Sequence, residues 1–454
     1  MSSAKVGPDF IDPGYHCLAT GQLPRNLDEW ICGSDAILPL AARAFGSSSI
    51  LIIEGVMGLF DGAVINGPSA STASIADLTD SPVLLVVDCS NLGQSVVALV
   101  RGFLDHHPSG SHYFQADGHK DQEDQKDQSN AHKSTIENEN TNEVSISKPS
   151  IVGIILNKVA NSSHAQLLVE SLSSTPVPIL GILYRDERFH WRDRHLGLIP
   201  VVEHPETISS SLDVLAGAIE ESLDLDAIYK LAIQASSIQT SPPPQADFVG
   251  NVQIGVASGP AFSFLYQDNI EQLQNAGAEI VEFNPLSDET LPIGVQGLLI
   301  GGGFPETYAK ELGGNISLNR SLANAASSGM PIWAECGGMA WLAKSLDSVP
   351  MSGVIDASVS MSVKLILGYR RAQLQADCPI GVSGTKLLGH EFHYSNIEPQ
   401  GSGLTVTGRN FQDYCGYASP SLFASYLHLH LGSNTLPAEN FVRSCVNASQ
   451  IRNC

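Results

Sequence analysis

A cysteine at a glycine-rich bend is the first candidate for chemistry in this sequence. The apolar, strand-like run 332–335 leads into Cys336, and Gly337 and Gly338 then precede a helical pattern over 339–346. A thiol on such a strand-to-helix turn is open to substrate, and a helix N-terminus favours the thiolate, which is the nucleophilic form. The alternative is a buried cysteine without a chemical role.

A second glycine-rich turn follows another apolar run. Residues 298–300 predict a strand, and Gly301, Gly302 and Gly303 come directly after it. Glycines at the carboxyl edge of a parallel sheet expose backbone N–H groups, which can form an oxyanion hole. The alternative is a glycine-rich turn without a functional role.

Two histidines near the C-terminus could activate the thiol. His428 and His430 alternate along an apolar run, so a strand would place both side chains on one face. Either could be the base for Cys336. A His-x-His pair can also bind a metal, but no third ligand follows at a suitable spacing.

The N-terminal part carries acidic candidates. Asp9 and Asp12 lie in the Pro- and Gly-bounded segment 5–16, where they could hold Mg²⁺ or contact polar groups of a substrate; an ordinary turn is the alternative. Glu54 follows the apolar run 50–53, the place of a metal-binding acid in nucleotide-binding sheets. Asp61 lies further along the same glycine-rich loop.

The elements that must position these residues alternate along the chain. Apolar, β-branched runs at 50–53, 83–87 and 151–156 predict strands buried on both faces, with helical stretches at 69–79 and 94–104 between them. This alternation predicts an α/β fold with a parallel sheet covered by helices on both sides.

Two polar segments divide the chain. Residues 106–150 nearly lack apolar side chains and predict a disordered insertion, whose histidines we interpret as solvated and not as a metal site. The proline-rich segment 236–250 predicts a linker. The alternation of strands and helices resumes after it, so we expect two α/β domains, 1–235 and 251–454.

Composition narrows the partners. A net charge of −23 argues against nucleic acid and against anionic membranes as partners. The eight cysteines show no metal-binding or paired spacing, which fits a reducing compartment. Since no apolar run approaches a membrane span and residues 1–10 lack a signal core, we expect a cytoplasmic protein.

Five motifs occur in order along the C-terminal half. They are Gly-Gly-Gly-Phe-Pro-Glu at 301–306, Ala-Glu-Cys-Gly-Gly-Met at 334–339, Leu-Gly-Tyr-Arg at 367–370, Gly-His-Glu-Phe-His-Tyr-Ser at 389–395 and Ser-Tyr-Leu-His-Leu-His at 425–430. With these motifs the chain resembles the cobyrinic acid a,c-diamide synthases, which join a P-loop-NTPase-like, dethiobiotin-synthetase-like domain to a flavodoxin-like class I glutamine amidotransferase domain. The resemblance covers nearly the whole chain apart from 106–150 and the linker.

The resemblance implies glutaminase chemistry in the C-terminal domain. Cys336 would attack the glutamine amide, and backbone N–H groups of Gly302, Gly303 and Gly337 would hold the oxyanion. His428 would be the base, with His430 as second choice. No acidic residue stands two positions after His428, where this class usually has one, so we expect a base without an orienting carboxylate.

For the N-terminal domain, the resemblance implies a ligase that uses ATP and Mg²⁺. A carboxylate of a corrinoid substrate would be phosphorylated, and ammonia from glutamine would displace the phosphate. Glu54 would hold Mg²⁺. The tetrapyrrole and metal site would be lined by Asp9, Asp12 and Asp61, and the adenine would be approached by Asn157 and Lys158.

The most serious departure from this family concerns the N-terminal domain. A smaller one is Gly259, which stands where the family usually has an aspartate. Gly-x-x-x-x-Gly-Lys-[Ser/Thr], the phosphate-binding loop that follows the family's first strand, occurs nowhere in the sequence. We expect weak ATP hydrolysis, and exposed apolar faces on the sheet neighbours of the missing strand. A sequence that is part of a longer protein explains this better than loss of synthetase activity, because the other motifs of that domain are intact.

Two other functions remain open at this point. The same motifs equally allow a nickel-sirohydrochlorin a,c-diamide synthase, which acts on another tetrapyrrole. The missing loop allows a homologue that is non-catalytic or only a glutaminase.

Overall fold

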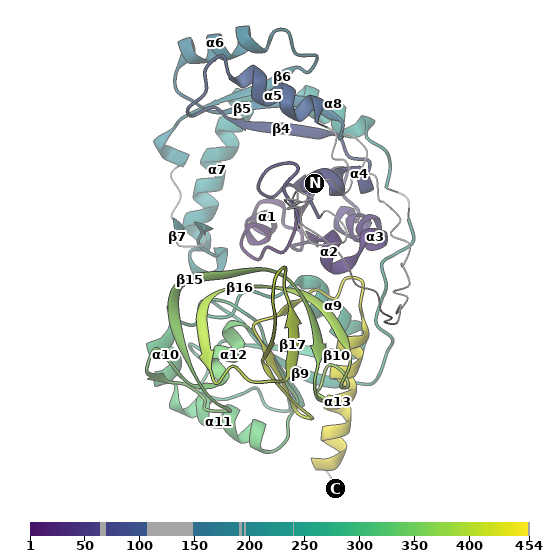
Figure 1. Ribbon diagram of the computed structural model, residues 1–454, viewed down its shortest axis with the longest axis vertical. Helices are drawn as coiled ribbons and strands as arrows, with labels where there is room; N and C mark the ends of the chain where they lie inside the picture. Colours follow the sequence, from purple (N-terminus) through teal and green to yellow (C-terminus); the bar gives the residue numbers. More distant parts are fainter. Residues whose placement is uncertain (64–69, 107–148, 190–192, 195–196, 239, 453–454) are drawn as a thin grey trace, which may run out of the picture.

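The computed structural model describes residues 1–63, 70–106, 149–189, 193–194, 197–238 and 240–452. Residues 107–148 of the predicted insertion lie outside this part of the chain. In the described ranges, no helix is long and apolar enough to cross a membrane. Figure 1 shows the N-terminal half above the C-terminal half, with the long helix α7 on one side.

The chain begins with a small parallel sheet. Strand β1 (Ser2–Val6) lies between β2 (Asn26–Leu27) and β3 (Leu51–Glu54), with Lys5 opposite both Asn26 and Glu54. Its connecting helices are α1 (Asp12–Thr20), α2 (Glu29–Cys32), α3 (Ser34–Phe45) and α4 (Thr72–Leu78). Asp12 therefore begins a helix, whereas Asp9 lies in the loop after β1.

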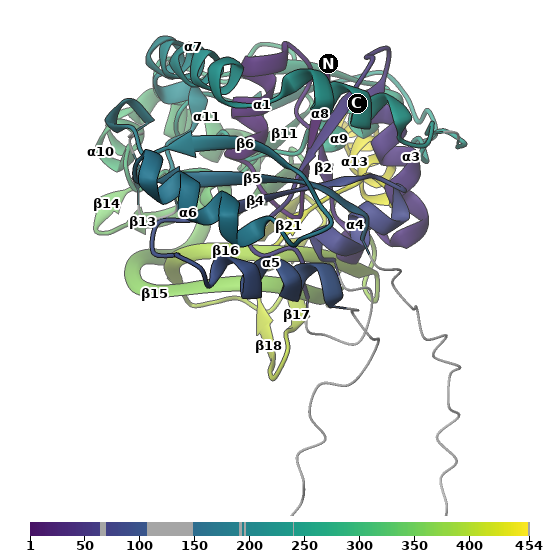
Figure 2. The ribbon, with the colours of Figure 1, turned by 90° about the horizontal axis from the view of Figure 1, so that it is seen from above.

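A second parallel sheet follows, separate from the first. It contains β4 (Val83–Asp88), β5 (Ile151–Val159) and β6 (Ile179–Tyr184), which run side by side in Figure 2. The helices of this part are α5 (Val96–Asp105), α6 (Ser162–Leu172), α7 (Pro205–Ser222) and α8 (Leu225–Gln234). The three strands expected at 50–53, 83–87 and 151–156 all form, but they do not share one sheet.

The prediction that β3 and β4 are buried on both faces is wrong. In the described part of the chain, β3 pairs with β1 alone and β4 pairs with β5 alone, so each has an open edge. Ile52 of β3 is 51% exposed and Val86 of β4 is 58% exposed. Each strand therefore exposes an apolar side chain beside an unpaired edge.

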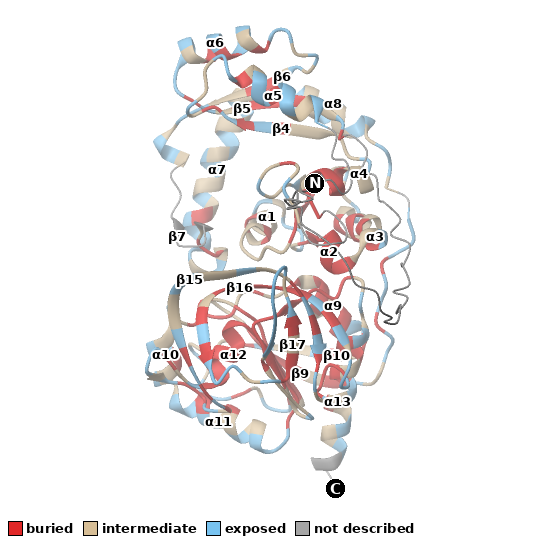
Figure 3. Cartoon of the chain, viewed as in Figure 1, coloured by how far each residue is buried: buried red, intermediate tan, exposed pale blue. Residues whose placement is uncertain are grey.

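The C-terminal half is built on a six-stranded sheet in the order β10-β9-β11-β12-β20-β19, parallel except for β19. Successive residues of its strands contribute to two separate hydrophobic clusters, one on each face. In Figure 3, many buried residues, drawn in red, lie in this half. The strands are β9 (Val252–Ala257), β10 (Ala278–Phe283), β11 (Gly297–Ile300), β12 (Ile332–Glu335), β19 (Tyr417–Ser419) and β20 (Leu422–Ser425).

Helices cover this sheet. They are α9 (Gln267–Asn275), α10 (Ala309–Gly314), α11 (Ile316–Ser327), α12 (Gly337–Leu342) and α13 (Leu436–Arg452). Between α12 and β20, and again after β20, the chain contributes to a second, mainly antiparallel sheet that was not predicted from the sequence. Its strands are β13 (Ala343–Leu346), β14 (Val349–Pro350), β15 (Ile355–Leu374), β16 (Lys386–Glu398), β17 (Leu404–Thr407), β18 (Gln412–Cys415) and β21 (His428–Leu429).

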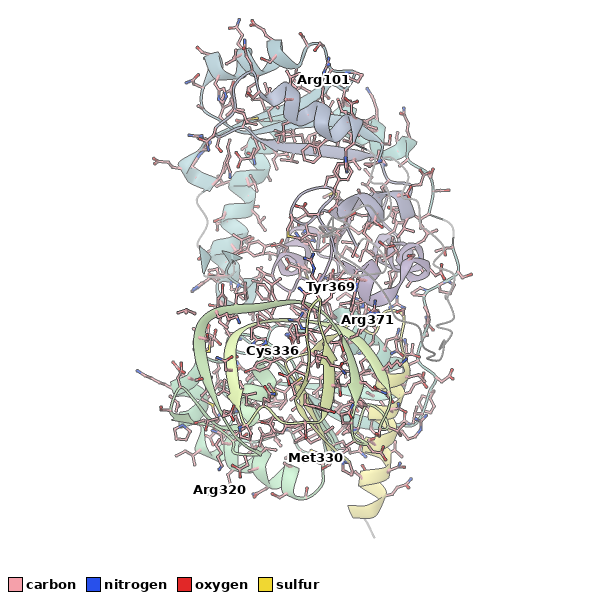
Figure 4. The ribbon with its side chains drawn as sticks, in the orientation of Figure 1. Arg101, Arg320, Met330, Cys336, Tyr369 and Arg371 are labelled. Carbon is pink, nitrogen blue, oxygen red and sulfur yellow. The ribbon has the colours of Figure 1, made fainter. Side chains whose placement is uncertain are left out.

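Charged side chains join the two halves. Arg43 Nη1 lies 2.8 Å from Asp268 Oδ1, and Arg25 Nη2 lies 2.7 Å from Glu271 Oε1. Beside this cluster, the Tyr369 hydroxyl donates to Asp28 Oδ2 at 2.9 Å. Tyr369 and the nearby Arg371 lie at the boundary between the halves in Figure 4. The N-terminal sheet is thereby fixed against α9 and β15.

Removing the shared carboxylate should weaken this interface. We expect Asp268→Asn to lower the free energy of unfolding by about 3 kcal/mol, because Asp268 is 1% exposed and two arginines would lose the more buried of the two carboxylates that they share. Urea denaturation measures the effect. Glu279→Gln, on the exposed side of β10, is the control and should change stability by less than about 0.5 kcal/mol. Equal midpoints for the two variants would contradict the role of the cluster.

Candidate active site

Cys336 lies on a strained turn between β12 and α12. Its backbone has φ 47° and ψ −103°, and no glycine relieves this conformation. The Cys336 N–H donates to Ser425 O of the neighbouring strand at 2.7 Å. This is the predicted strand-to-helix turn, and Figure 4 places Cys336 near the boundary of the two halves. The helix is shorter than predicted, because it ends at Leu342 and residues 343–346 form β13.

His428 reaches the thiol from the other side. Strand β21 pairs with β16, with His428 opposite His390, and the His428 ring lies close enough to the Cys336 thiol for that thiol to raise the pKa of His428. The approach needs a glycine at position 302, since a Cβ there would lie 2.5 Å from His428 Cε1. The two residues predicted to be nucleophile and base are therefore in contact.

A carboxylate also faces His428, contrary to the expectation of a base without one. Glu335 Oε2 lies 3.5 Å from His428 Nδ1, and both side chains are 1% exposed. Burial lowers the pKa of His428, but the contacts with Cys336 and Glu335 outweigh burial and raise it to about 9. Glu335 was missed because it precedes the nucleophile and does not follow the base.

His430, the second candidate base, has other partners. Its Nδ1 lies 3.2 Å from Cys32 Sγ, and its Nε2 lies 3.8 Å from Asp268 Oδ2. Burial lowers the pKa of His430, although Asp268 opposes this effect. His430 therefore belongs to the contact between the two halves, whereas His428 belongs to the thiol.

A pocket opens beside the sulfur. Its lining includes Cys336, Gly303, Gly337, Phe304 and Tyr394. The backbones of the two glycines approach each other, since a Cβ on Gly337 would lie 3.1 Å from the Gly303 nitrogen. Both glycine backbones therefore adjoin the pocket beside the sulfur.

Gly302 differs from the other two glycines of the predicted oxyanion hole. Its N–H donates to Phe264 O at 3.0 Å, and its carbonyl accepts from Phe264 N at 3.0 Å. This amide is engaged within the fold. Gly302 instead makes room for the ring of His428. The prediction that its N–H holds the oxyanion is therefore wrong.

The unpredicted sheet supplies another wall of the pocket. His393 of β16 stacks on Tyr426 with ring centroids 3.6 Å apart, and Ser395 Oγ donates to the Tyr426 hydroxyl at 3.0 Å. Burial lowers the pKa of His393 to about 4, so this ring is neutral at physiological pH. The motif at 389–395 thus lies at the active site.

A phenylalanine from the N-terminal half covers the base. The ring of Phe10 lies 5.0 Å from His428, 4.4 Å from Tyr266, 5.3 Å from Phe264 and 5.7 Å from His390. Phe10 comes from the loop after β1 and stands directly beside Asp9. The predicted acidic site and the thiol site therefore meet through one side chain.

The acidic candidates gather around a buried lysine. Lys5 Nζ lies 2.6 Å from Asp12 Oδ2 and 3.3 Å from Glu54 Oε1, while His16 Nε2 lies 2.5 Å from Glu54 Oε2. Burial raises the pKa of Glu54, but the contacts with His16 and Lys5 outweigh it, so the net shift is downward. Lys5 and His16 were not among the predicted site residues.

The two remaining aspartates are engaged in turns. Asp9 Oδ1 accepts from the N–H groups of Ile11 and Asp12 at 2.8 and 3.0 Å, and burial, followed by the charge of Asp12, raises its pKa. Asp61 Oδ2 accepts from the Gly58 N–H at 2.9 Å within its own loop. The first of these carboxylates adjoins Phe10, and the second lies on the exposed loop after β3.

The predicted adenine residues lie on the second sheet. Asn157 and Lys158 are near the carboxyl end of β5, and Lys158 Nζ contacts Asp88 Oδ2 at 2.8 Å. Lys158 adopts φ 56°, a turn-like conformation at a strand end. Its side chain is 57% exposed, so it is accessible to a ligand.

The described residues contain no group of three or more His, Cys, Asp or Glu side chains arranged to hold a metal ion. Mg²⁺, however, needs only one or two carboxylates when phosphates and waters complete its shell. Glu54 fits that requirement once Lys5 or His16 releases one of its oxygens.

Comparisons with known proteins identify the family of this chain. The CobB/CobQ-like glutamine amidotransferase domain family matches residues 253–436. The hydrogenobyrinate a,c-diamide synthase of Streptomyces coelicolor is 38% identical, over 98% of this chain and 91% of that protein. The cobyrinate a,c-diamide synthases of a Synechococcus strain and of Priestia megaterium are 34% and 33% identical, each over 99% of this chain and over 93% and 91% of their own lengths.

Identity at this level over nearly the full length extends well beyond the amidotransferase domain. The chain therefore belongs to the family of cobyrinate and hydrogenobyrinate a,c-diamide synthases, glutamine-dependent amide ligases with a CobB/CobQ-like amidotransferase domain.

Proposed function

We propose that the protein makes cobyrinic acid a,c-diamide in cobalamin biosynthesis, with glutamine as nitrogen donor and ATP as energy source. The observation that carries this proposal is the contact between Cys336, on its strained turn, and His428. Family membership supports the substrate, since the named relatives are synthases of this diamide or of its hydrogenobyrinate counterpart.

The glutaminase steps follow from the arrangement around the sulfur. His428 takes the proton of Cys336, and the thiolate attacks the carboxamide carbon of glutamine. N–H groups of Gly303 and Gly337 hold the oxyanion that forms. The proton on His428 then passes to the leaving nitrogen, ammonia departs, and water hydrolyses the remaining thioester to glutamate.

The acidic cluster supports the synthetase half of the proposal. ATP with Mg²⁺ supplies the phosphoryl group that activates a substrate carboxylate. Glu54 would hold the metal ion, and Asn157 and Lys158 would approach the adenine. Lys5, Asp12 and His16 fix the position of Glu54, while Asp9, Asp12 and Asp61 would line the tetrapyrrole site.

Cys336→Ala tests the two-site scheme. The variant should lose glutamine hydrolysis completely, because no other sulfur replaces the nucleophile. If the ATP site is complete, amidation with high free ammonia should persist, since that step does not use the thiol. Glutamate release and diamide formation are measured in parallel. If the unmutated protein forms the diamide from free ammonia, loss of both activities in a folded Cys336→Ala variant would contradict the scheme.

The two histidines give a paired test. We expect His428→Ala to lower kcat for glutamine hydrolysis by roughly 10²–10⁴-fold, as for loss of a general base. His430→Ala should change kcat far less, because its ring contacts Cys32 and Asp268. A larger loss of kcat in His430→Ala than in His428→Ala would reverse the assignment.

ATP turnover tests the synthetase half separately. Without a Gly-x-x-x-x-Gly-Lys-[Ser/Thr] loop, this chain should hydrolyse ATP slowly or not at all in the presence of the corrinoid substrate and ammonia. Phosphate release measures this. Robust turnover would mean that other residues bind the phosphates.

A further inference from the structure

Glu335 is an enclosed carboxylate to which the reaction above assigns no task. It is the last residue of β12, and it is 1% exposed. The Trp333 indole N–H donates to its Oε1 at 3.0 Å, and the Leu429 N–H donates to the same oxygen at 3.3 Å. A buried carboxylate is stable only when its oxygens are bonded. These two donors therefore fix the orientation of the whole group.

The second oxygen of Glu335 faces the base. His428 Nδ1 lies 3.5 Å from Oε2, and no group in the described part of the chain makes an aligned hydrogen bond to this nitrogen. Both side chains are enclosed, so bulk water is not an alternative partner. Hydrogen bonds of catalytic groups are often long before substrate binds and shorten when charge develops.

We propose that Glu335 is the positioning residue of the glutaminase site, where its carboxylate holds the Nδ1–H of His428 and leaves Nε2 to take the proton of Cys336. This inference rests on the proposed function, because His428 is the base there. One proton moves from sulfur to Nε2, and the carboxylate stays ionised beside the imidazolium.

The register between β12 and β20 explains how an acid directly before the nucleophile can reach the base. Glu335 pairs with Ser425, and the chain then turns so that His428 and the N–H of Leu429 lie over the carboxylate. The acid therefore comes from the strand that carries the nucleophile.

Apart from the Cys336 thiolate, Glu335 is the negatively charged group that faces His428. Burial, followed by the charge of His428, lowers the pKa of His390 well below its usual value, and burial lowers that of His393 to about 4. Phe10 is apolar, and burial keeps the pKa of Tyr266 well above its usual value. The titratable and aromatic groups facing His428 are Cys336, Glu335, His390, His393, Tyr266 and Phe10.

Glu335→Gln separates positioning from packing. The glutamine carbonyl can still accept from Trp333 and Leu429, but its NH₂ would face Nδ1 and favour the tautomer protonated at Nε2, which cannot accept a proton from sulfur. We expect kcat for glutamine hydrolysis to fall roughly 10²–10⁴-fold, with KM for glutamine little changed. Glu335→Asp, which keeps the charge, should recover part of kcat.

The pH profile gives a readout that packing alone does not move. The leaving nitrogen needs the proton on His428, so the rate falls at high pH as the imidazolium is lost. Removing the carboxylate destabilises that cation. The alkaline limb of kcat should therefore move to lower pH by about one unit or more in Glu335→Gln. The matched control is Glu439→Gln. Glu439 is another buried glutamate, in α13, and accepts a hydrogen bond from Thr435. This variant should keep the wild-type alkaline limb of kcat.

Alkylation of Cys336 by iodoacetamide, followed by mass spectrometry of its peptide, tests the same contact without glutamine. If the wild-type protein has no glutaminase activity, the proposed function fails, but the pH dependence of alkylation should still differ between wild type and Glu335→Gln. Unchanged alkylation and activity profiles in Glu335→Gln would overturn the inference. So would a fall in kcat with an unmoved alkaline limb, because that result means that Glu335 serves only packing.

Discussion

The active site depends on the pairing of β12 with β20. The hydrogen bond from Cys336 N–H to Ser425 O ends this pairing at the point where the first strand turns into α12. His428 follows Ser425 by one short turn, so the same register that presents the sulfur also presents the ring. A slip of one residue would reverse the faces of the strand and separate nucleophile from base. The strained backbone of Cys336 is tolerated because β11, β12 and β20 are buried around it.

Much of the C-terminal half could be predicted because its signals are local. A buried parallel strand followed by glycine is visible in a short window, and this identified β11, β12 and the turn at Cys336. The antiparallel sheet was missed, although β15 alternates buried and exposed residues at its beginning. Its long strands contain few of the Gly and Pro residues that mark strand ends elsewhere in the chain. The motif at 389–395 was recognised, but its place beside the pocket depends on pairing between distant segments.

The roles of single residues were harder to predict than the elements. Gly302 looked like an oxyanion donor because glycines after a strand expose their amides, but its pairing with Phe264 is a contact between segments. Glu335 was overlooked for a similar reason, since proximity to His428 follows from register and not from spacing. In the N-terminal half, the sequence shows no Gly-x-x-x-x-Gly-Lys-[Ser/Thr] pattern, and the burial predicted for β3 and β4 was wrong because each has an unpaired edge in the described part of the chain.

Phe10 has a consequence for how the two halves fit together. Its ring packs beside His428 of the C-terminal half, while its backbone belongs to the loop after β1 in the N-terminal half, next to Asp9. The aromatic surroundings of His428 therefore come from both halves, because Tyr266 and His390 lie beside the same ring of Phe10. Two consecutive residues of one loop, Asp9 and Phe10, thus adjoin the acidic residues of one half and the imidazole of the other.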